Sequence, residues 1–150
     1  MAPRTLFRIF SIAELFTWAG LITALILRAT GTADIVSIAG GIHGFIFLCY
    51  VATTIFVWVN QQWKPRIGVT GVALAIIPFA TLPFELWADR NNLLDGTWRL
   101  APGGETPQNF VEKIQALVLA RPVVAAVLLL LIVSVVFSVL LYLGPPIPQS

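Results

Sequence analysis

The sequence predicts an all-α membrane protein, a bundle of four transmembrane helices with a short extracytoplasmic connector that contains an amphipathic helix. Hydrophobic residues make up 58% of the 150 residues, the mean hydropathy is +0.90, and only 11% of residues are charged. A soluble domain has about 25% charged residues. This length holds about four spans of roughly 20 residues with modest loops, so we expect a single integral-membrane domain over residues 1–150.

The first two expected spans cover about residues 5–27 and 35–59. The basic start followed by an apolar stretch resembles a signal peptide, but the stretch is too long for one and contains Glu14. We therefore interpret it as the first span. A turn follows Arg28, and the second span ends in a polar turn at Pro65, because proline cannot continue the hydrogen bonding of a helix.

The third and fourth expected spans cover about residues 67–87 and 122–143. Pro78 and Pro83 fall inside the third, so we expect its backbone to kink or change pitch there. The fourth is the most uniformly apolar stretch of the chain. A segment rich in proline, residues 144–150, stops it.

A polar connector, residues 88–121, separates the last two spans. Its first half is rich in turn residues. In its second half Thr106 is a candidate N-cap, with Pro107 at the first helical position. Apolar residues then recur at helical spacing, which predicts a short amphipathic helix at the membrane surface. A helical turn that only leads into the last span is the alternative.

Lysine and arginine in short loops indicate orientation. A plain count gives five on one side against four on the other and does not decide. Their density near the ends of the spans favours a cytoplasmic N-terminus and a cytoplasmic C-terminus. The formal net charge is only +2, and no cluster of four or more Lys and Arg marks a patch for nucleic acid or anionic lipid. We expect no nucleic-acid partner.

Glu14 and His43 are ionisable residues deep inside apolar spans, where charge is costly and residue choice is usually functional. Estimated from span ends, Glu14 lies roughly 15 Å from the cytoplasmic end and His43 roughly 12 Å from the opposite face. Side chains lean toward the N-terminus of their helix, which moves these two apart. We therefore do not expect a direct Glu14–His43 pair.

Hydroxyl groups offer Glu14 other partners. Tyr50 and Ser134 lie near its estimated depth, so either could hydrogen-bond the carboxyl group. Glu14 could carry protons or contact a partner protein. The alternative is a protonated carboxyl group that only holds helices together.

His43 has an expected partner in Glu85, with Thr81 completing the cluster. As the chain's one histidine, His43 is a weak candidate for haem or metal ligation, because no Cys or carboxylate stands at ligand spacing on its helix. We expect no catalytic residues, no metal site and no cofactor. Gly40 and Gly44 form a Gly-x-x-x-Gly face that permits close helix packing.

The first ninety residues resemble the bacterial integral-membrane domain of unknown function 3817 family, with an added fourth span. The resemblance rests on a membrane glutamate, a His-Gly pair and a third span with proline and an acidic residue. The matching residues are Arg8, Ala13, Glu14, Gly40, His43, Gly44, Tyr50, Pro78, Phe79, Thr81 and Glu85. The resemblance implies a bacterial plasma membrane and no established chemistry. The chain departs from it in the connector, the last span and the lone Arg28 after the first span.

We expect a non-catalytic accessory subunit or assembly factor of a larger membrane complex, with a respiratory cytochrome complex or supercomplex as the best guess. Its expected partners are the lipid bilayer and other integral-membrane subunits. One alternative is a haem- or quinone-binding protein that uses His43. Another is a small transporter or proton pathway that uses Glu14. No phosphate loop, zinc signature or activated nucleophile supports an enzyme.

Overall fold

A computed structural model describes residues 1–143, and the expected stop at 144–150 lies outside the described residues. The regular secondary structure of the described part is α-helical apart from one 3-10 turn, with no strand, which confirms the predicted all-α class. In chain order the elements are α1 (Pro3–Ala29), α2 (Val36–Gln61), α3 (Pro65–Ala73), η1 (Leu74–Ile76), α4 (Thr81–Arg90), α5 (Phe110–Ala120) and α6 (Pro122–Leu143).

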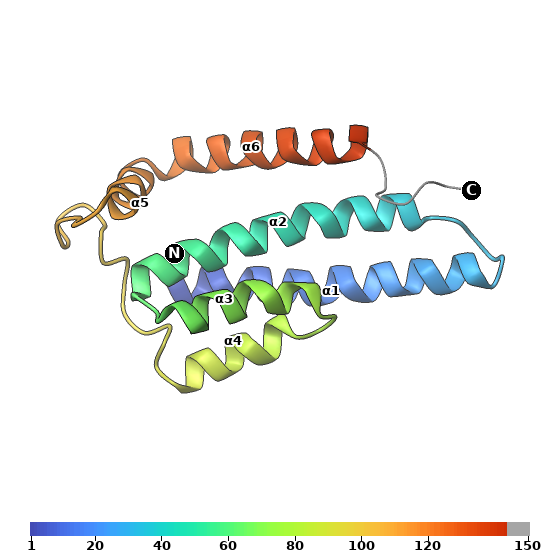
Figure 1. Cartoon of the computed structure of the whole chain (residues 1–150), viewed down its shortest axis with the longest axis horizontal. Coiled ribbons are helices and arrows are strands. Elements are labelled where there is room, and N and C mark those ends of the chain that lie inside the picture. The colour runs from blue at the N-terminus through green and yellow to red at the C-terminus, as the bar shows by residue number, and fades with distance from the viewer. Residues whose placement is uncertain (144–150) are drawn as a thin grey trace.

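Three helices, α1, α2 and α6, are long and apolar enough to cross a membrane. α1 begins with Pro3 at its first turn, where the missing N–H costs nothing, and a turn through Gly31 (φ +70°) leads to α2. α2 runs back beside α1, and α6 lies along the outer side of α2 (Figure 1). Phe137 of α6 faces Gly41 and Gly44 near the start of α2, so α6 ends where α2 begins.

The third expected span, residues 67–87, is not one continuous helix. It forms a hairpin in which α3 and η1 run inward and α4 returns (Figure 1). α3 and η1 together rise about 18 Å and α4 about 15 Å, and neither covers a hydrocarbon core of about 30 Å. The chain reverses where Pro78 lacks an N–H and Phe79 adopts a left-handed conformation (φ +64°). We expected a kink or change of pitch near Pro78, and the chain instead reverses its direction there.

Contacts with α1 show that the hairpin reaches inward and then returns toward the start of that helix. In chain order they join Ala75 O to Trp18 Nε1 (3.2 Å), Thr81 Oγ1 to Ser11 O (3.2 Å) and Glu85 Oε1 to Arg8 Nε (2.9 Å). Trp18 lies roughly 22 Å along α1 from Pro3, whereas Arg8 lies only roughly 8 Å along it. The end of α4 therefore shares a membrane side with the start of α1.

The connector consequently lies at the N-terminal end of the bundle. Trp98 donates its indole N–H to the carbonyl of Met1, and Asn60, near the end of α2, donates to Thr97 O at 3.2 Å. The structure thus corrects two expectations: residues 67–87 do not form one continuous helix, and the connector lies at the N-terminal end of the bundle and not at the opposite end. The described ends of the chain, Met1 and Leu143, lie at opposite ends of the bundle, whereas we expected both termini on one side, and the C-terminus itself lies outside the described residues.

An aromatic core holds the N-terminal end together. Phe7 of α1 stacks on Tyr50 with ring centroids 5.7 Å apart and meets the edges of Trp63 (5.9 Å) and Phe84 (6.1 Å). These rings come from α1, α2, the turn after α2 and α4. The hairpin is therefore packed into the core of the bundle.

Cysteine labelling tests this topology, because residues 28 and 113 lie on opposite sides here and would share a side in a four-span bundle. In a Cys49→Ala background, Arg28→Cys and Lys113→Cys should react with a membrane-impermeant maleimide in oppositely oriented vesicles. Labelling of both cysteines from the same side would contradict the hairpin.

Candidate functional site

The most deeply placed polar cluster joins α1 to α2 through Glu14, Thr17 and His43. Glu14 is fully buried and His43 is 9% exposed. Thr17 Oγ1 lies 3.1 Å from His43 Nδ1 and 3.4 Å from Glu14 Oε2, and the two ionisable groups approach to 3.8 Å. The expectation that these two side chains stay apart is wrong.

Thr17 explains the difference. It follows Glu14 by three residues and so shares its face of α1, where its hydroxyl bridges the carboxyl group to the imidazole. The glutamate side chain is also long and flexible enough to reach toward His43, although its helix directs it the other way. The Glu14–Thr17 spacing was the sequence signal that could have revealed the bridge.

The surroundings of this cluster are apolar. The Trp18 ring centroid lies 4.4 Å from that of His43, and the Phe47 centroid lies 6.4 Å from it. Glu14 Oε1 is buried without a hydrogen-bond partner among the described residues. Carboxyl, hydroxyl and imidazole groups can each bind or relay a proton, so the cluster can hold a proton between two helices.

The partners expected for Glu14 lie elsewhere. Tyr50 is fully buried and donates its hydroxyl to the carbonyl of Gly71 at 3.1 Å, which ties α2 to α3. Ser134 is exposed on α6, and its carbonyl accepts a hydrogen bond from Ser138. Neither side chain hydrogen-bonds Glu14 in the structure, so the expected Glu14–Tyr50 and Glu14–Ser134 contacts are wrong.

Glu85 belongs to a second cluster, at the start of α1. Arg8 reaches Glu85 Oε1 at 2.9 Å and Asp89 Oδ2 at 3.0 Å, and Arg4 also pairs with Asp89. The expected His43–Glu85 interaction is wrong because the hairpin returns Glu85 to the N-terminal end. Arg4 and Arg8, like Glu85 and Asp89, are spaced by four residues, and this matched spacing was the missed signal.

Thr81 is buried near this second cluster, and it does not complete a His43 site. Its hydroxyl donates to Ser11 O at 3.2 Å, which fixes the first turn of α4 against α1.

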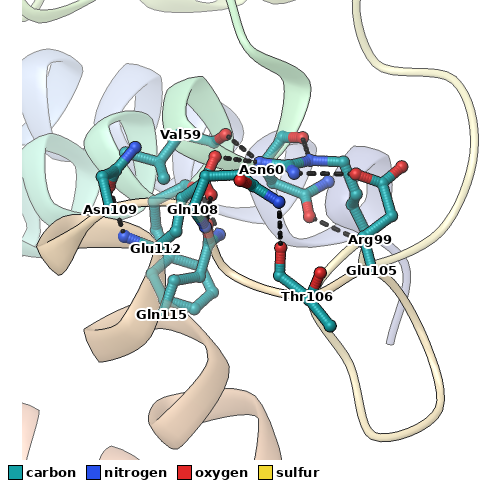
Figure 2. Close-up of polar contacts among 10 residues, drawn as sticks. Val59, Asn60, Arg99, Glu105, Thr106, Gln108, Asn109, Glu112 and Gln115 are labelled. Atoms are coloured by element: carbon teal, nitrogen blue, oxygen red, sulfur yellow. Dashed lines mark hydrogen bonds and ion pairs between the residues drawn. The ribbon is translucent and has the colours of Figure 1, made fainter.

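A third cluster fastens the connector to the end of α2 (Figure 2). Arg99 donates to the carbonyls of Asn60 (3.2 Å) and Val59 (3.5 Å), which lie near the C-terminus of α2, where carbonyls lack the regular partners of the helix interior. The same guanidinium binds Glu105 at 2.9 Å and Glu112 at 2.7 Å. A cation at the negative end of the helix dipole, held by two carboxylates, orders the connector.

α5 begins later than the sequence indicated. Asn109 is its N-cap, accepting from Glu112 N at 2.9 Å, in place of Thr106. Glu112 in turn accepts from Gln108 N at 2.7 Å, and Gln115 donates to Phe56 O of α2 at 2.8 Å. The predicted amphipathic helix is present, and one face of it is docked on α2.

The two glycines predicted for close packing face different helices. Gly40 faces Leu21 of α1, whereas Gly44 faces Phe137 of α6. The tightest approach is at Gly68 of α3, where the Trp58 ring occupies the space that a Cβ would need. Among the described residues, no group of three or more His, Cys, Asp and Glu side chains is placed to hold a metal ion.

The fold and these clusters define a small multi-span integral-membrane protein with buried ionisable groups. Residues 4–90, which run from α1 to the end of α4, match the family model of the domain of unknown function DUF3817, and the chain belongs to this family. The connector beyond Arg90, α5 and α6 lie outside the matched region.

The chain is also similar to a Streptomyces coelicolor protein named "Putative membrane protein SCO5905", with 36% identity over 87 residues. The match covers 56% of this chain and 10% of that protein, so the chain spans about a tenth of the length of its curated relative. No solved structure matches the chain.

The Arg8 ion pairs should stabilise the fold measurably. Arg8→Ala leaves the fully buried Glu85 without its cation, so we expect a loss of about 2–3 kcal/mol, less than for a fully buried pair because Arg8 is 39% exposed. Unfolding in mixed SDS micelles measures it. Arg28→Ala, which breaks an exposed contact with Asp34, should cost at most about 0.5 kcal/mol. Equal losses in both variants would contradict the role given to Arg8.

The connector should loosen in acid. The N–H of Gln108 and the Arg99 guanidinium hold the pKa of Glu112 below its ordinary range. A carboxylate with a lowered pKa in the folded state stabilises that state above its ordinary pKa, and this is lost as the pH falls below about 4. Trp98 fluorescence should report the loss in the wild type and in Glu105→Gln. The loss should be largely removed in Glu112→Gln, and an unchanged transition there would contradict this assignment.

Proposed function

We propose that the protein is a non-catalytic accessory subunit or assembly factor of a larger bacterial membrane complex. The observation that carries this proposal is α6, a helix of 22 residues without a charge that lies outside the family-matched region. Most of its large side chains are exposed in the isolated chain, among them Leu131 (56%) and Val135 (61%).

The packing of α6 supports a docking role. Phe137 packs against Gly41 and Gly44 of α2, and Val133 is 5% exposed, whereas most of the other large side chains described for α6 are exposed. Helices in lipid associate through close van der Waals packing, so a nearly bare helix offers a large surface to the helices of another subunit.

The assembly we propose is a respiratory cytochrome complex or supercomplex. The support is an analogy, since such complexes collect small helical subunits that carry no catalytic group. In this proposal the three polar clusters of the chain are structural contacts between its helices, which hold the subunit in one conformation.

Purification of the tagged full chain from its native membrane in a mild detergent should recover stoichiometric partners. In a matched variant the exposed residues of α6 that are not already leucine are changed to leucine, with Val133 and Phe137 kept. This variant should still insert and should lose the partners. A control variant changes Ile9, Ile12 and Phe16 of α1 to leucine and should keep them. A wild-type particle without partners, or an α6 variant that keeps them, would contradict the proposal.

A proton pathway through Glu14 is the second candidate, and the Glu14–Thr17–His43 cluster favours it. The cluster lies near the middle of α1, roughly 16–21 Å from Pro3, where an ionisable pair can receive a proton from one side. Haem or quinone binding by His43 stays a prediction, which the absorption spectrum of the purified protein tests.

Proton flux into proteoliposomes tests the second candidate. Wild-type protein should dissipate an imposed pH gradient faster than empty vesicles, and Glu14→Gln should remove the difference. Glu105→Gln, which changes an exposed carboxylate of the connector, should leave it intact. Equal flux in the wild type and Glu14→Gln would rule out Glu14 as the carrier.

A further inference from the structure

The hairpin concentrates positive charge at one end of the molecule. Arg28 alone lies at the opposite end, in the last turn of α1. The other eight of the nine Lys and Arg lie at the end where α1 begins: Arg4, Arg8, Lys64, Arg66, Arg90, Arg99, Lys113 and Arg121. The sequence indicated no anionic-lipid patch because these residues are scattered along the chain, and the fold gathers them on one membrane side.

Most of this charge is free. Arg4, Arg8 and Arg99 are held in ion pairs that use Glu85, Asp89, Glu105 and Glu112. Five exposed cations form no ion pair among the described residues: Lys64, Arg66, Arg90, Lys113 and Arg121. Asp95 is the one acidic residue at this end that is likewise unpaired in the described part of the chain. This end therefore presents a strongly positive surface.

α5 adds an apolar face to the positive surface. Phe110 is 76% exposed, Ile114 48% and Leu117 63%, although these are large apolar side chains. Lys113 lies on the same face, three residues after Phe110 and four before Leu117, and Arg121 follows as the C-cap residue of α5. The opposite face of α5 is buried against the connector and α2 through Glu112 and Gln115.

The direction of α5 fits a position in the membrane interface. It runs across the direction of α2 and α6 at the end of the bundle (Figure 1). A helix in this position buries its apolar face at the boundary of the acyl chains. Lys and Arg on that face extend their ends toward the phosphate groups.

We propose that this end of the bundle binds the phosphate headgroups of anionic phospholipids, with Lys113 of α5 and Arg121, the C-cap residue of that helix, as the principal contacts. Charge complementarity selects this occupant, because a zwitterionic headgroup offers no net charge to five unpaired cations. By the distribution of Lys and Arg, the leaflet is the cytoplasmic one. An acidic protein segment would match the charge, but it would leave Phe110, Ile114 and Leu117 without an acyl environment.

Native mass spectrometry of the detergent-purified full chain, titrated with phosphatidylglycerol or with phosphatidylcholine of the same acyl chains, tests the proposal. The wild type should bind phosphatidylglycerol more tightly. Lys113→Gln with Arg121→Gln should weaken phosphatidylglycerol binding by about fivefold for each cation removed and leave phosphatidylcholine binding unchanged. Arg28→Gln, at the opposite end, is the matched control and should bind both lipids like the wild type.

The proposal would be overturned by equal affinity of the wild type for both lipids, by an unchanged phosphatidylglycerol preference in the double variant, or by an equal loss in Arg28→Gln. Circular dichroism checks that the variants stay helical. If the Lys113 and Arg121 variant does not fold, Lys64→Gln with Arg66→Gln, at the start of α3, carries the same expectation. An acidic protein that is retained in place of phosphatidylglycerol would also overturn it.

Discussion

The pairing of Arg4 and Arg8 with Glu85 and Asp89 is the constraint on which the rest of the structure depends. Glu85 is fully buried, and a buried carboxylate is strongly disfavoured unless a cation accompanies it. The cations stand in the first two turns of α1. α4 must therefore return to that end, and it forms with α3 and η1 a hairpin whose two arms are each too short to span a hydrocarbon core of about 30 Å.

The direction of every later element follows from that return. The connector starts at the N-terminal end, Arg99 fastens it to the last carbonyls of α2, and α6 crosses from there to the opposite end. The reversal at Ile77–Ala80 places irregular backbone at depth. Backbone polar groups away from water need hydrogen-bond partners within the protein. Two turn hydrogen bonds supply some of them here: Ile77 N donates to Leu74 O and Ala80 N donates to Ile77 O, both at 3.2 Å.

The sequence predicts the long helices correctly, because length and hydropathy determine where they begin and end. The ranges expected for the first, second and last spans correspond to α1, α2 and α6, because each is a long apolar stretch with turn residues at its ends. The prediction failed for residues 67–87, which match a span in length but contain two short helices separated by Pro78 and Phe79. Whether such a segment crosses depends on the partners of its charged residues, which are long-range contacts.

The candidate site shows the same limit. Glu14 and His43 stand out in the sequence because ionisable residues are rare in apolar spans, but their pairing depends on the Thr17 bridge and on the exact stagger of α1 and α2. Glu85 was assigned to His43 because the third span was expected to cross. Once the hairpin is known, the spacing of Arg4 and Arg8 against Glu85 and Asp89 explains its true partners.

Chemical cross-linking measures the central contact directly. In a Cys49→Ala background with Arg8 intact, Arg4→Cys with Asp89→Cys should be joined by a short bifunctional thiol reagent, since the two side chains meet in the folded chain. Arg28→Cys with Asp89→Cys should not be joined, because position 28 lies at the far end of α1. Cross-linking of the second pair and not the first would show that residues 67–87 cross the bilayer, and would contradict the hairpin.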